Sequence, residues 1–243
     1  MKKLYVIGIG PGNPQNMTAA CRSAIEEADV MIGYSKYIEL LTPLYPDKPT
    51  LATPMTQEID RCRAALELAA GEKTTAVICS GDAGVYGMAG LIYELSAKFP
   101  PVEIEVIPGV SAAMAGAALL GAPLIHDFAV ISLSDLLTPW SLIEKRLSSA
   151  AAADFCIVLY NPASKNRSDH LRRACDILLR HKNSETVCGL AHSIGRNGQS
   201  SEVMSLDQLQ KARVDMFTTV FIGNTQTRRL NGKMVTPRGY PLD

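Results

Sequence analysis

Short apolar runs alternate with segments of helical periodicity along nearly the whole chain of 243 residues. Runs of this length are typical of buried strands, and the segments between them place apolar residues on one helical face. Such alternation predicts an α/β fold in which most strands are parallel and are joined by helices. The expected strands are Leu4–Ile9, Val30–Ile32, Thr75–Cys79, Glu103–Ile107, Ala129–Leu133, Phe155–Tyr160, Thr186–Ala191 and Thr218–Ile222.

Two of the expected helices have clear boundaries. A helix over Glu58–Ala70 ends at Gly71, as helices often do. Its apolar face is predicted to consist of Ile59, Cys62, Leu66 and Ala69. A second helix is expected to open at Thr138 and Pro139, with a capping residue followed by a proline in the first turn.

The segment Ser111–Leu120 is small and apolar throughout, which predicts a helix buried against a sheet. It ends at Gly121-Ala122-Pro123, a sequence that interrupts helices and strands alike. We therefore place the boundary between two α/β domains here, with residues 1–122 in the first and 123–243 in the second.

The charge balance and the apolar runs limit the classes of partner. Lys and Arg number 24, as do Asp and Glu, so the formal net charge is zero. Nucleic-acid-binding proteins usually have a strongly basic surface. The first apolar run is too short for a signal peptide, and none reaches the length of a membrane span. We expect neither a nucleic-acid nor a membrane partner.

The cysteines and histidines are scattered. Six cysteines without a C-x-x-C pair, mostly at apolar positions of expected helices or strands, predict reduced thiols and a cytoplasmic location. The four histidines are isolated from one another and lack the spacing of metal ligands. We expect no metal site in the protein.

Three glycine-containing turns each follow an expected strand directly: Gly8–Gly12, Gly81–Gly87 and Pro108–Ala112. The carboxyl ends of parallel strands meet at one edge of a sheet, so these turns should lie together where ligands commonly bind. Glycine permits a positive φ and a close approach of a ligand, and proline stiffens a loop. The turns predict a rigid cradle for a small molecule; the alternative is three ordinary strand-to-helix turns.

The first turn differs from two familiar nucleotide-binding patterns. The dinucleotide pattern G-x-G-x-x-G requires a third glycine where this chain has Asn13, and an acidic residue where the second strand ends in Gly33-Tyr34. The phosphate-binding pattern G-x-x-x-x-G-K-[ST] does not occur in the sequence. A dinucleotide or a nucleoside triphosphate is therefore disfavoured as the ligand.

The three turns resemble those of the tetrapyrrole (corrin/porphyrin) methylase family. Its members have a strand followed by G-x-G-P-G, then a G-D-P or G-D-A turn and later a P-G-x-S-A turn, which match Gly8–Gly12, Gly81–Ala83 and Pro108–Ala112. Within the family, Ile131–Trp140 and Tyr160–Arg167 resemble the precorrin-3B carbon-17 methyltransferases. The resemblance covers essentially the whole chain and implies two α/β domains with a cofactor cleft between them.

The resemblance also implies an activity. It is the methylation of carbon 17 of precorrin-3B or cobalt-precorrin-3B, with ring contraction, in cobalamin biosynthesis. S-adenosylmethionine would be the methyl donor and S-adenosylhomocysteine the product, any cobalt would belong to the substrate, and the protein would be a homodimer. By motif, the cofactor-binding residues are Gly10, Pro11, Gly12, Gly81, Asp82, Ala83, Val85, Tyr86, Ser111, Ala112 and Asn161.

Ring contraction moves a proton from an oxygen substituent, so a general acid or base is expected near the substrate. The candidates are His126, Asp135 and Asp82. A histidine titrates closest to neutral pH, which favours His126, although a histidine at the start of a strand is as often structural. For Asp82 the structural alternative is stronger, because turn aspartates often bind their own backbone.

The carboxylates on the rim of a tetrapyrrole require cationic partners. Lys165, Arg167 and Arg196 are predicted to bind them, the alternative for each being an ordinary surface charge. Relatives often have an arginine early and a glutamate late in the segment where this chain has His192 and Gln199, so no role is assigned to those two positions.

Two other functions stay open on the sequence. One is a tetrapyrrole methylase with a different position specificity, and the other is a noncatalytic module that binds a tetrapyrrole or the cofactor. The segment Tyr160–Arg167 favours the carbon-17 enzymes over the first alternative. Formation of a methylated product would exclude the second.

Overall fold

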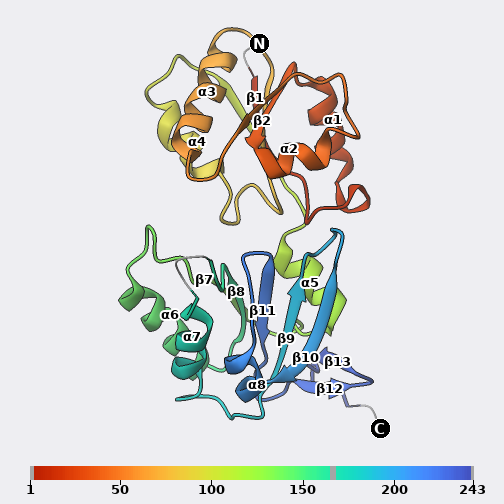
Figure 1. The fold of residues 1–243 in the computed structure, drawn as a ribbon, viewed down its shortest axis with the longest axis vertical. Helices are drawn as coiled ribbons and strands as arrows, with labels where there is room; N and C mark the ends of the chain where they lie inside the picture. Colours follow the sequence, from red (N-terminus) through yellow and green to blue (C-terminus); the bar gives the residue numbers. More distant parts are fainter. Residues whose placement is uncertain (1–2, 165–167, 242–243) are drawn as a thin grey trace. The chain divides into compact units, whose positions relative to one another are not determined.

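The computed structural model describes residues 3–164 and 168–241. The chain forms two compact units, Met1–Ala112 and Ala113–Asp243, which we describe separately (Figure 1). Each unit has its own sheet and its own hydrophobic core. The division lies after Ala112, rather than after Ala122 as the sequence suggested.

The boundary differs because helix α5 (Ala112–Leu120) packs on the sheet of the second unit. A Cβ atom added to Gly116 of this helix would lie 2.8 Å from the ring of Phe221, and one added to Gly189 would lie 2.7 Å from the side chain of Leu120. Glycine at both contacts lets helix and sheet approach closely. The expected buried helix is therefore present, but it belongs with the residues that follow it.

The first unit is a parallel five-stranded sheet in the order β3-β2-β4-β1-β5. Its strands are β1 (Lys3–Gly8), β2 (Val30–Tyr34), β3 (Thr50–Thr53), β4 (Thr75–Cys79) and β5 (Glu103–Ile107). Its helices are η1 (Pro14–Asn16, a 3-10 helix), α1 (Ala19–Glu27), α2 (Ser35–Leu41), α3 (Glu58–Ala70) and α4 (Ala89–Ser96). The expected α/β class is confirmed.

Helices cover both faces of this sheet, which is why its central strands are continuous apolar runs. Leu4 and Val6 of β1 pack in the core with α3 and α4, whereas Tyr5 and Ile7 pack in the core with α1 and α2 (Figure 1). Full burial of an aliphatic side chain contributes roughly 1.5–3 kcal/mol. Burial on both faces therefore makes β1 an interior strand, between β4 and β5, with its carboxyl end leading into the first glycine turn.

The boundaries of α3 agree with the prediction, but its buried face differs from the expected one. Cys62, Leu66 and Ala69 are fully buried, whereas Ile59 is 54% exposed. Arg61 is the unexpected buried residue of this helix: its guanidinium donates to the Thr53 hydroxyl at 2.7 Å and to the carbonyl of Pro54 at 2.9 Å. These bonds tie α3 to the segment that follows β3.

The second unit has a mixed five-stranded sheet in the order β10-β9-β11-β8-β7. Its strands are β7 (Phe128–Ser132), β8 (Cys156–Tyr160), β9 (Val187–His192), β10 (Ser200–Ser205) and β11 (Thr218–Ile222). Strands β7 and β8 are parallel, and β11 runs antiparallel to both β8 and β9. The prediction of mostly parallel sheets is therefore wrong for this unit, because the short turn between β9 and β10 can join only antiparallel strands.

Helices also cover both faces of the second sheet. Helices α6 (Trp140–Ala152), α7 (His170–Leu178) and α8 (Leu206–Lys211) pack in its main core, and α5 covers the opposite face. Helix α6 starts at Trp140 with Pro139 at its N-cap, so the expected side-chain cap from Thr138 is not formed. A small sheet of β12 (Arg228–Leu230), β13 (Lys233–Val235) and β6 (Gly121–Ala122) completes the unit.

Candidate active site

The three glycine turns follow β1, β4 and β5, which are neighbours in the first sheet. Strand β1 is paired in parallel with β4 on one side and with β5 on the other. The turns therefore emerge side by side at the carboxyl edge of this sheet, as the sequence predicted. This is the position at which α/β proteins generally bind their ligands.

The first two turns are joined through their backbones. The Gly10 N–H donates to the carbonyl of Gly81 at 3.0 Å, and the Gly81 N–H donates to the carbonyl of Gly10 at 2.8 Å. Both glycines have a positive φ, +79° at Gly10 and +67° at Gly81, which other residues adopt only at a cost in energy. The reciprocal pair of hydrogen bonds fixes one turn against the other.

Close packing between turns explains the glycines better than ligand approach does. A Cβ atom on Gly8 would lie 2.7 Å from the oxygen of Gly81 and 2.8 Å from the nitrogen of Gly109. A Cβ atom on Gly10 would lie 2.8 Å from the oxygen of Asn16. At Gly8 and Gly10 the absence of a side chain makes room for neighbouring backbone, and the approach of a ligand to these turns stays a prediction.

Asp82 holds the second turn to the third. Its Oδ1 accepts hydrogen bonds from the N–H groups of Gly84 at 2.8 Å and Val85 at 3.2 Å, and its Oδ2 accepts one from the N–H of Gly109 at 2.9 Å. A carboxylate engaged by three backbone donors is a structural clamp. These three bonds favour the structural alternative for Asp82, and its role as the general acid or base stays a prediction.

The exposed part of the second turn is the segment Gly84–Gly87. Val85 is 40% exposed and Tyr86 is 56% exposed. Tyr86 has a φ of +54°, and a tyrosine in the left-handed region costs about 1–3 kcal/mol, a strain that proteins retain mainly at functional sites. This segment is the part of the cradle best placed to meet a ligand.

The other expected cofactor residues of the first unit are less exposed. The side chain of Ala83 is fully buried in the core with Met88 and Ala89, so its backbone alone could contact a ligand. Ser111 is 9% exposed. Pro11 is buried, and Gly12 and Ala112 are partly buried. The structure thus places all of these residues at the carboxyl edge of the sheet, where their side chains contribute little of the exposed surface.

In the second unit, Asn161 lies where β8 ends and bonds to the end of the neighbouring strand. Its Nδ2 donates to the hydroxyl of Ser132 at 3.0 Å, and its φ is +54°. The hydroxyl of Tyr160 accepts a hydrogen bond from the N–H of Ala113 at 2.8 Å, which satisfies a donor in the first turn of α5. The carboxyl ends of β7 and β8 and the start of α5 are thereby linked.

Asp135 lies in the loop after β7, at the same edge as Asn161. Its Oδ2 lies 3.0 Å from Nε2 of His170, the first residue of α7. On the other side of the ring, Nδ1 lies 3.2 Å from Oδ1 of Asp169. Burial acts to raise the pKa of Asp169, but the hydrogen bond with His170 and the nearby charge of Arg173 lower it below its usual value. Sequence reasoning identified Asp135 and missed His170.

Arg196 also reaches this edge. Strands β8 and β9 both run antiparallel to β11, so they point in the same direction and end at the same edge. Arg196 follows β9, is partly buried, and its guanidinium carbon lies 5.6 Å from the centre of the Phe217 ring. The structure therefore brings Asp135, Asn161 and Arg196 together at one edge. The predicted substrate residues Lys165 and Arg167 lie outside the described residues.

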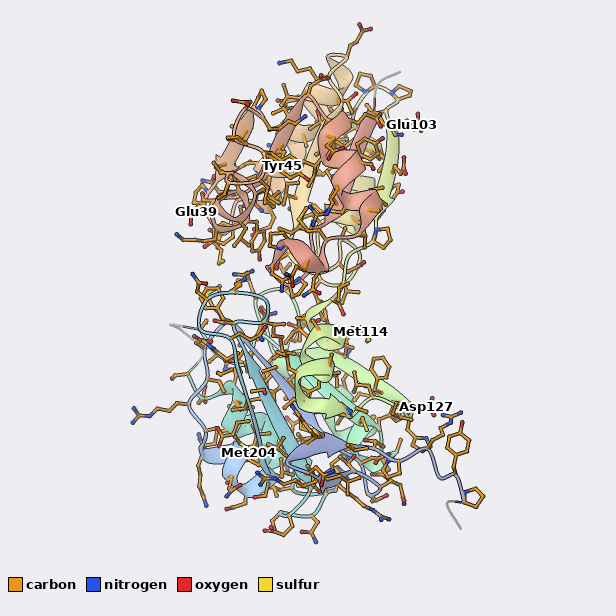
Figure 2. All side chains as sticks on the ribbon, turned by 90° about the vertical axis from the view of Figure 1, so that its right-hand side faces the viewer. Glu39, Tyr45, Glu103, Met114, Asp127 and Met204 are labelled. Carbon is orange, nitrogen blue, oxygen red and sulfur yellow. The ribbon has the colours of Figure 1, made fainter. Side chains whose placement is uncertain are left out.

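His126 is not part of this group. It precedes β7, which begins at Phe128, whereas Asn161 and Asp135 follow the carboxyl ends of β8 and β7. Its neighbour Asp127 lies beside the start of β7 (Figure 2). A strand therefore separates His126 from Asp135 and Asn161, and the role of His126 as the general acid or base stays a prediction.

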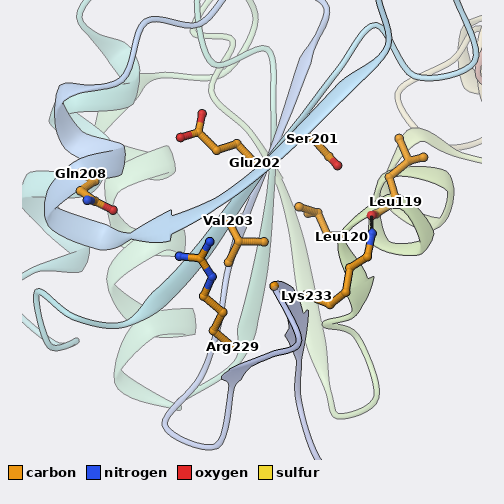
Figure 3. Close-up of a pocket in the computed structure, with 9 residues that line it drawn as sticks. Leu119, Leu120, Ser201, Glu202, Val203, Gln208, Arg229 and Lys233 are labelled. Carbon is orange, nitrogen blue, oxygen red and sulfur yellow. Dashed lines mark hydrogen bonds between the residues drawn. The ribbon is translucent and has the colours of Figure 1, made fainter.

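A cavity of about 420 Å³ lies elsewhere on the second unit, beside β10 and β13 (Figure 3). Its polar lining includes Glu202, Arg229 and Lys233, and Nζ of Lys233 donates to the carbonyl of Leu119 at 3.0 Å. None of the residues predicted for the active site lines it. We assign it no part in the chemistry.

Within residues 3–164 and 168–241, His, Cys, Asp and Glu side chains form no group of three or more that could hold a metal ion. Among the helices in this part of the chain, none has the length and apolar character needed to cross a membrane.

Comparison with known proteins decides the family. The model of the Tetrapyrrole (Corrin/Porphyrin) Methylases matches residues 3–210, which is most of the chain. This chain belongs to the tetrapyrrole methylase family. The resemblance seen in the three turns is thereby confirmed, and the chain is a methyltransferase.

Individual relatives of this tetrapyrrole methylase match it from end to end. It is 48% identical to a probable cobalt-factor III C(17)-methyltransferase of Salmonella typhimurium, over 98% of this chain and 100% of the relative. It is 40% identical to a precorrin-3B C(17)-methyltransferase of a Sinorhizobium species, over 98% of this chain and 96% of the relative.

A solved structure shows the same fold. The crystal structure of the methyltransferase CobJ matches this tetrapyrrole methylase with a TM-score of 0.89 and 36% identity, over 96% of this chain and 99% of that chain. The expected fold class is therefore confirmed by a related protein as well as by the strand order.

Proposed function

We propose that this tetrapyrrole methylase transfers a methyl group from S-adenosylmethionine to carbon 17 of a tetrapyrrole, with ring contraction, in cobalamin biosynthesis. The observation that supports this most strongly is the 48% identity to the Salmonella typhimurium relative, which covers 98% of this chain and 100% of the relative. The relatives named for cobalt-factor III and for precorrin-3B differ in substrate but share carbon 17. The carbon position is therefore the best supported part of the proposal.

The glycine cradle of the first unit suits methyl transfer. Transfer from a sulfonium is an in-line displacement, so a protein accelerates it mainly by aligning the donor with the acceptor carbon. The bonds between Gly10 and Gly81 and the three bonds of Asp82 make these turns a fixed surface. When bound, S-adenosylmethionine supplies the methyl group and leaves as S-adenosylhomocysteine. Val85 and the strained Tyr86 are the residues we propose to contact it.

The carboxyl edge of the second unit suits an acidic substrate. Arg196 is held there by its contact with Phe217 and offers a guanidinium that can grip a rim carboxylate with two hydrogen bonds. Lys165 and Arg167 stay predicted partners of the same carboxylates. Any cobalt would be held by the macrocycle. The homodimer and the cytoplasmic location also stay predictions.

The experiment is an anaerobic incubation of the protein with ¹³C-methyl S-adenosylmethionine and either cobalt-factor III or precorrin-3B. Mass measurement is expected to show the gain of one methyl group with one of the two substrates, and NMR to locate the label on carbon 17. A label on another carbon would assign the chain a different position specificity. No labelled product with either substrate would overturn the proposed function.

A further inference from the structure

His170 and Asp135 meet at the carboxyl edge of the second sheet although they are far apart in the sequence. Asp135 follows β7 and His170 follows β8, and these two strands are paired in parallel with Ser132 opposite Tyr160. The loop that contains Asp135 also exposes Leu136 and Leu137, which are 77% and 93% exposed. The contact with His170 ties this exposed loop to the first turn of α7.

The imidazole of His170 is enclosed from several sides. The residue is 4% exposed, and its ring packs edge-on against Trp140, with 4.9 Å between ring centres. The guanidinium of Arg173 stacks on Trp140 at 3.9 Å from the ring centre. Among the residues that the structure describes, the charged or titratable side chains around the imidazole are Asp135 from the loop after β7, and Asp169 and Arg173 at the start of α7.

The buried Nε2 atom of His170 makes no hydrogen bond with any of the described residues. It lies within ion-pair distance of Asp135 Oδ2, at 3.0 Å, but outside hydrogen-bond geometry. Leaving such an atom unsatisfied costs about 1–3 kcal/mol, and few buried polar groups in folded proteins are left so. The bond of Nδ1 with Asp169 Oδ1 at 3.2 Å and packing against Trp140, rather than a hydrogen bond from Nε2, therefore hold the ring beside the Asp135 carboxylate.

The two side chains differ in access to solvent. The side chain of His170 is 5% exposed, too little to touch a ligand, whereas that of Asp135 is 37% exposed. A histidine in this position can act on a substrate only through the carboxylate. An imidazole N–H or its positive charge beside a carboxylate favours the ionised form of the acid.

We propose that His170 is a positioning residue that holds the Asp135 carboxylate, ionised and oriented, as the general base of the methylation reaction. This inference rests on the proposed function. In the reaction the macrocycle gains a methyl cation from the sulfonium and loses one proton from a hydroxyl substituent. The electron pair of that O–H bond becomes part of a C=O bond as the carbon–carbon bond migrates. Asp135 accepts the proton and releases it to water after turnover.

The test compares Asp135→Asn, His170→Phe and the double variant. Phenylalanine keeps a ring against Trp140 and removes both ring nitrogens. General-base catalysis contributes about 10²–10⁴-fold, so Asp135→Asn should lower kcat by that factor. His170→Phe should lower kcat by at least roughly tenfold, because it removes part of the contribution of general-base catalysis. Neither variant should change the affinity for S-adenosylmethionine measured by calorimetry.

Two readouts separate positioning from a structural role. The acidic limb of the kcat profile should move to higher pH in His170→Phe, because the carboxylate loses the neighbour that favours its ionised form. In the Asp135→Asn background, His170→Phe should have no further effect on kcat, since it acts through that carboxylate. The inference would be overturned if His170→Phe lowered kcat equally in the wild type and in Asp135→Asn. It would also be overturned if the acidic limb of the kcat profile did not move.

His181→Phe is the matched control. His181 lies just beyond the other end of α7, where its Nε2 bonds to the Ser148 hydroxyl at 2.8 Å, and its loss should leave kcat unchanged. If His170→Phe fails to fold, His170→Gln provides the same comparison with a side chain that retains an N–H donor and should recover part of kcat. A wild-type protein that forms no methylated product would refute the proposed function, whereas a normal product with unaffected variants would refute this inference alone.

Discussion

The carboxylate of Asp82, in the turn after β4, accepts a hydrogen bond at 2.9 Å from the backbone N–H of Gly109, in the turn after β5. The same side chain bonds to the N–H groups of Gly84 and Val85 within its own turn. One aspartate therefore sets the conformation of the second glycine turn and its distance from the third. The shape of the proposed cofactor cradle, which is made of backbone, therefore depends on this side chain.

Replacing Asp82 by Asn should weaken cofactor binding. The amide cannot offer an acceptor to all three N–H groups, and each lost bond to a charged group is worth about 1.5–3 kcal/mol. We expect the affinity for S-adenosylmethionine, measured by calorimetry, to fall by roughly tenfold or more. Asp29→Asn is the control, because Asp29 Oδ2 accepts from the N–H of Thr74 at 2.8 Å near the amino end of β4. If both variants lose affinity equally, the clamp has no special role in binding.

Alanine should destabilise the protein at one glycine of the cradle and leave its stability almost unchanged at another. At Gly109 a Cβ atom would overlap the carbonyl oxygen of Gly81 and lie 2.5 Å from that of Gly8. Overpacking of this kind costs about 1–3 kcal/mol or more. At Gly84 the nearest atom would be Asp82 Oδ1 at 3.4 Å, so we expect a change within about 0.5 kcal/mol.

Denaturation with urea measures both effects, and a Gly109→Ala variant as stable as the wild type would show that the turns are not packed as described. Gly84→Ala also tests the position of the cofactor. If S-adenosylmethionine lies against the exposed segment Gly84–Gly87, this variant should bind it more weakly while keeping its stability. Unchanged affinity would place the cofactor away from that segment.

The pair of Asp154 and Lys182 predicts a pH-dependent stability. Nζ of Lys182, whose side chain is 3% exposed, lies 3.2 Å from Asp154 Oδ1. Partial burial acts to raise the pKa of Asp154, but hydrogen bonds from Thr225 and Lys182 lower it below its ordinary value of 3.8. A lowered pKa in the folded state stabilises the protein above the unfolded value, and this contribution is lost as the pH falls through the folded value.

Asp154→Asn should therefore reduce the free energy of unfolding more at about pH 6 than at about pH 3. Asp207→Asn, which removes an exposed partner of Lys211 at 2.8 Å, is the control and should have a small effect at both. Urea denaturation at the two pH values provides the measurement. If Asp154→Asn lost the same free energy of unfolding at both pH values, the result would contradict the assigned interaction between Asp154 and Lys182.

The buried thiols should resist alkylation. All six cysteines are free and buried, and burial raises the pKa to about 11 for Cys21 and Cys79 and to about 12 for Cys62 and Cys175. The thiolate is the reactive form. Iodoacetamide at about pH 8 should leave the native protein unmodified by mass spectrometry, while the protein in urea is alkylated at all six. Rapid modification of the native protein would show that the cores open readily.

The sequence predicted the first unit better than the second. In the first unit, buried strands such as Thr75–Cys79 are apolar throughout, and their ends coincide with glycine turns. Strand β3 (Thr50–Thr53) was missed because it is short and most of it is exposed at an edge, so no apolar pattern marks it. Strand β10 (Ser200–Ser205), also at an edge, was missed because its first three residues are exposed and polar or charged, so no continuous apolar run marks it.

The candidate site, too, was predicted only in part. Gly8–Gly12, Gly81–Gly87 and Pro108–Ala112 could be placed at one edge because backbone turns leave a pattern in the sequence. The pairing of His170 with Asp135 could not, because it depends on the alignment of β7 with β8 and on the packing of Trp140. One signal was available: His170 begins the helix that follows the Tyr160–Arg167 segment, whose resemblance to the carbon-17 enzymes was specific.

The backbone bridge between Gly10 and Gly81 has an evolutionary consequence. Its two hydrogen bonds join main-chain atoms, and such atoms are the same whatever side chains surround them. Substitutions in the surrounding side chains can therefore accumulate without altering the way the two turns are joined. A lineage built on this plan can vary the surface around these turns while the connection between them is inherited.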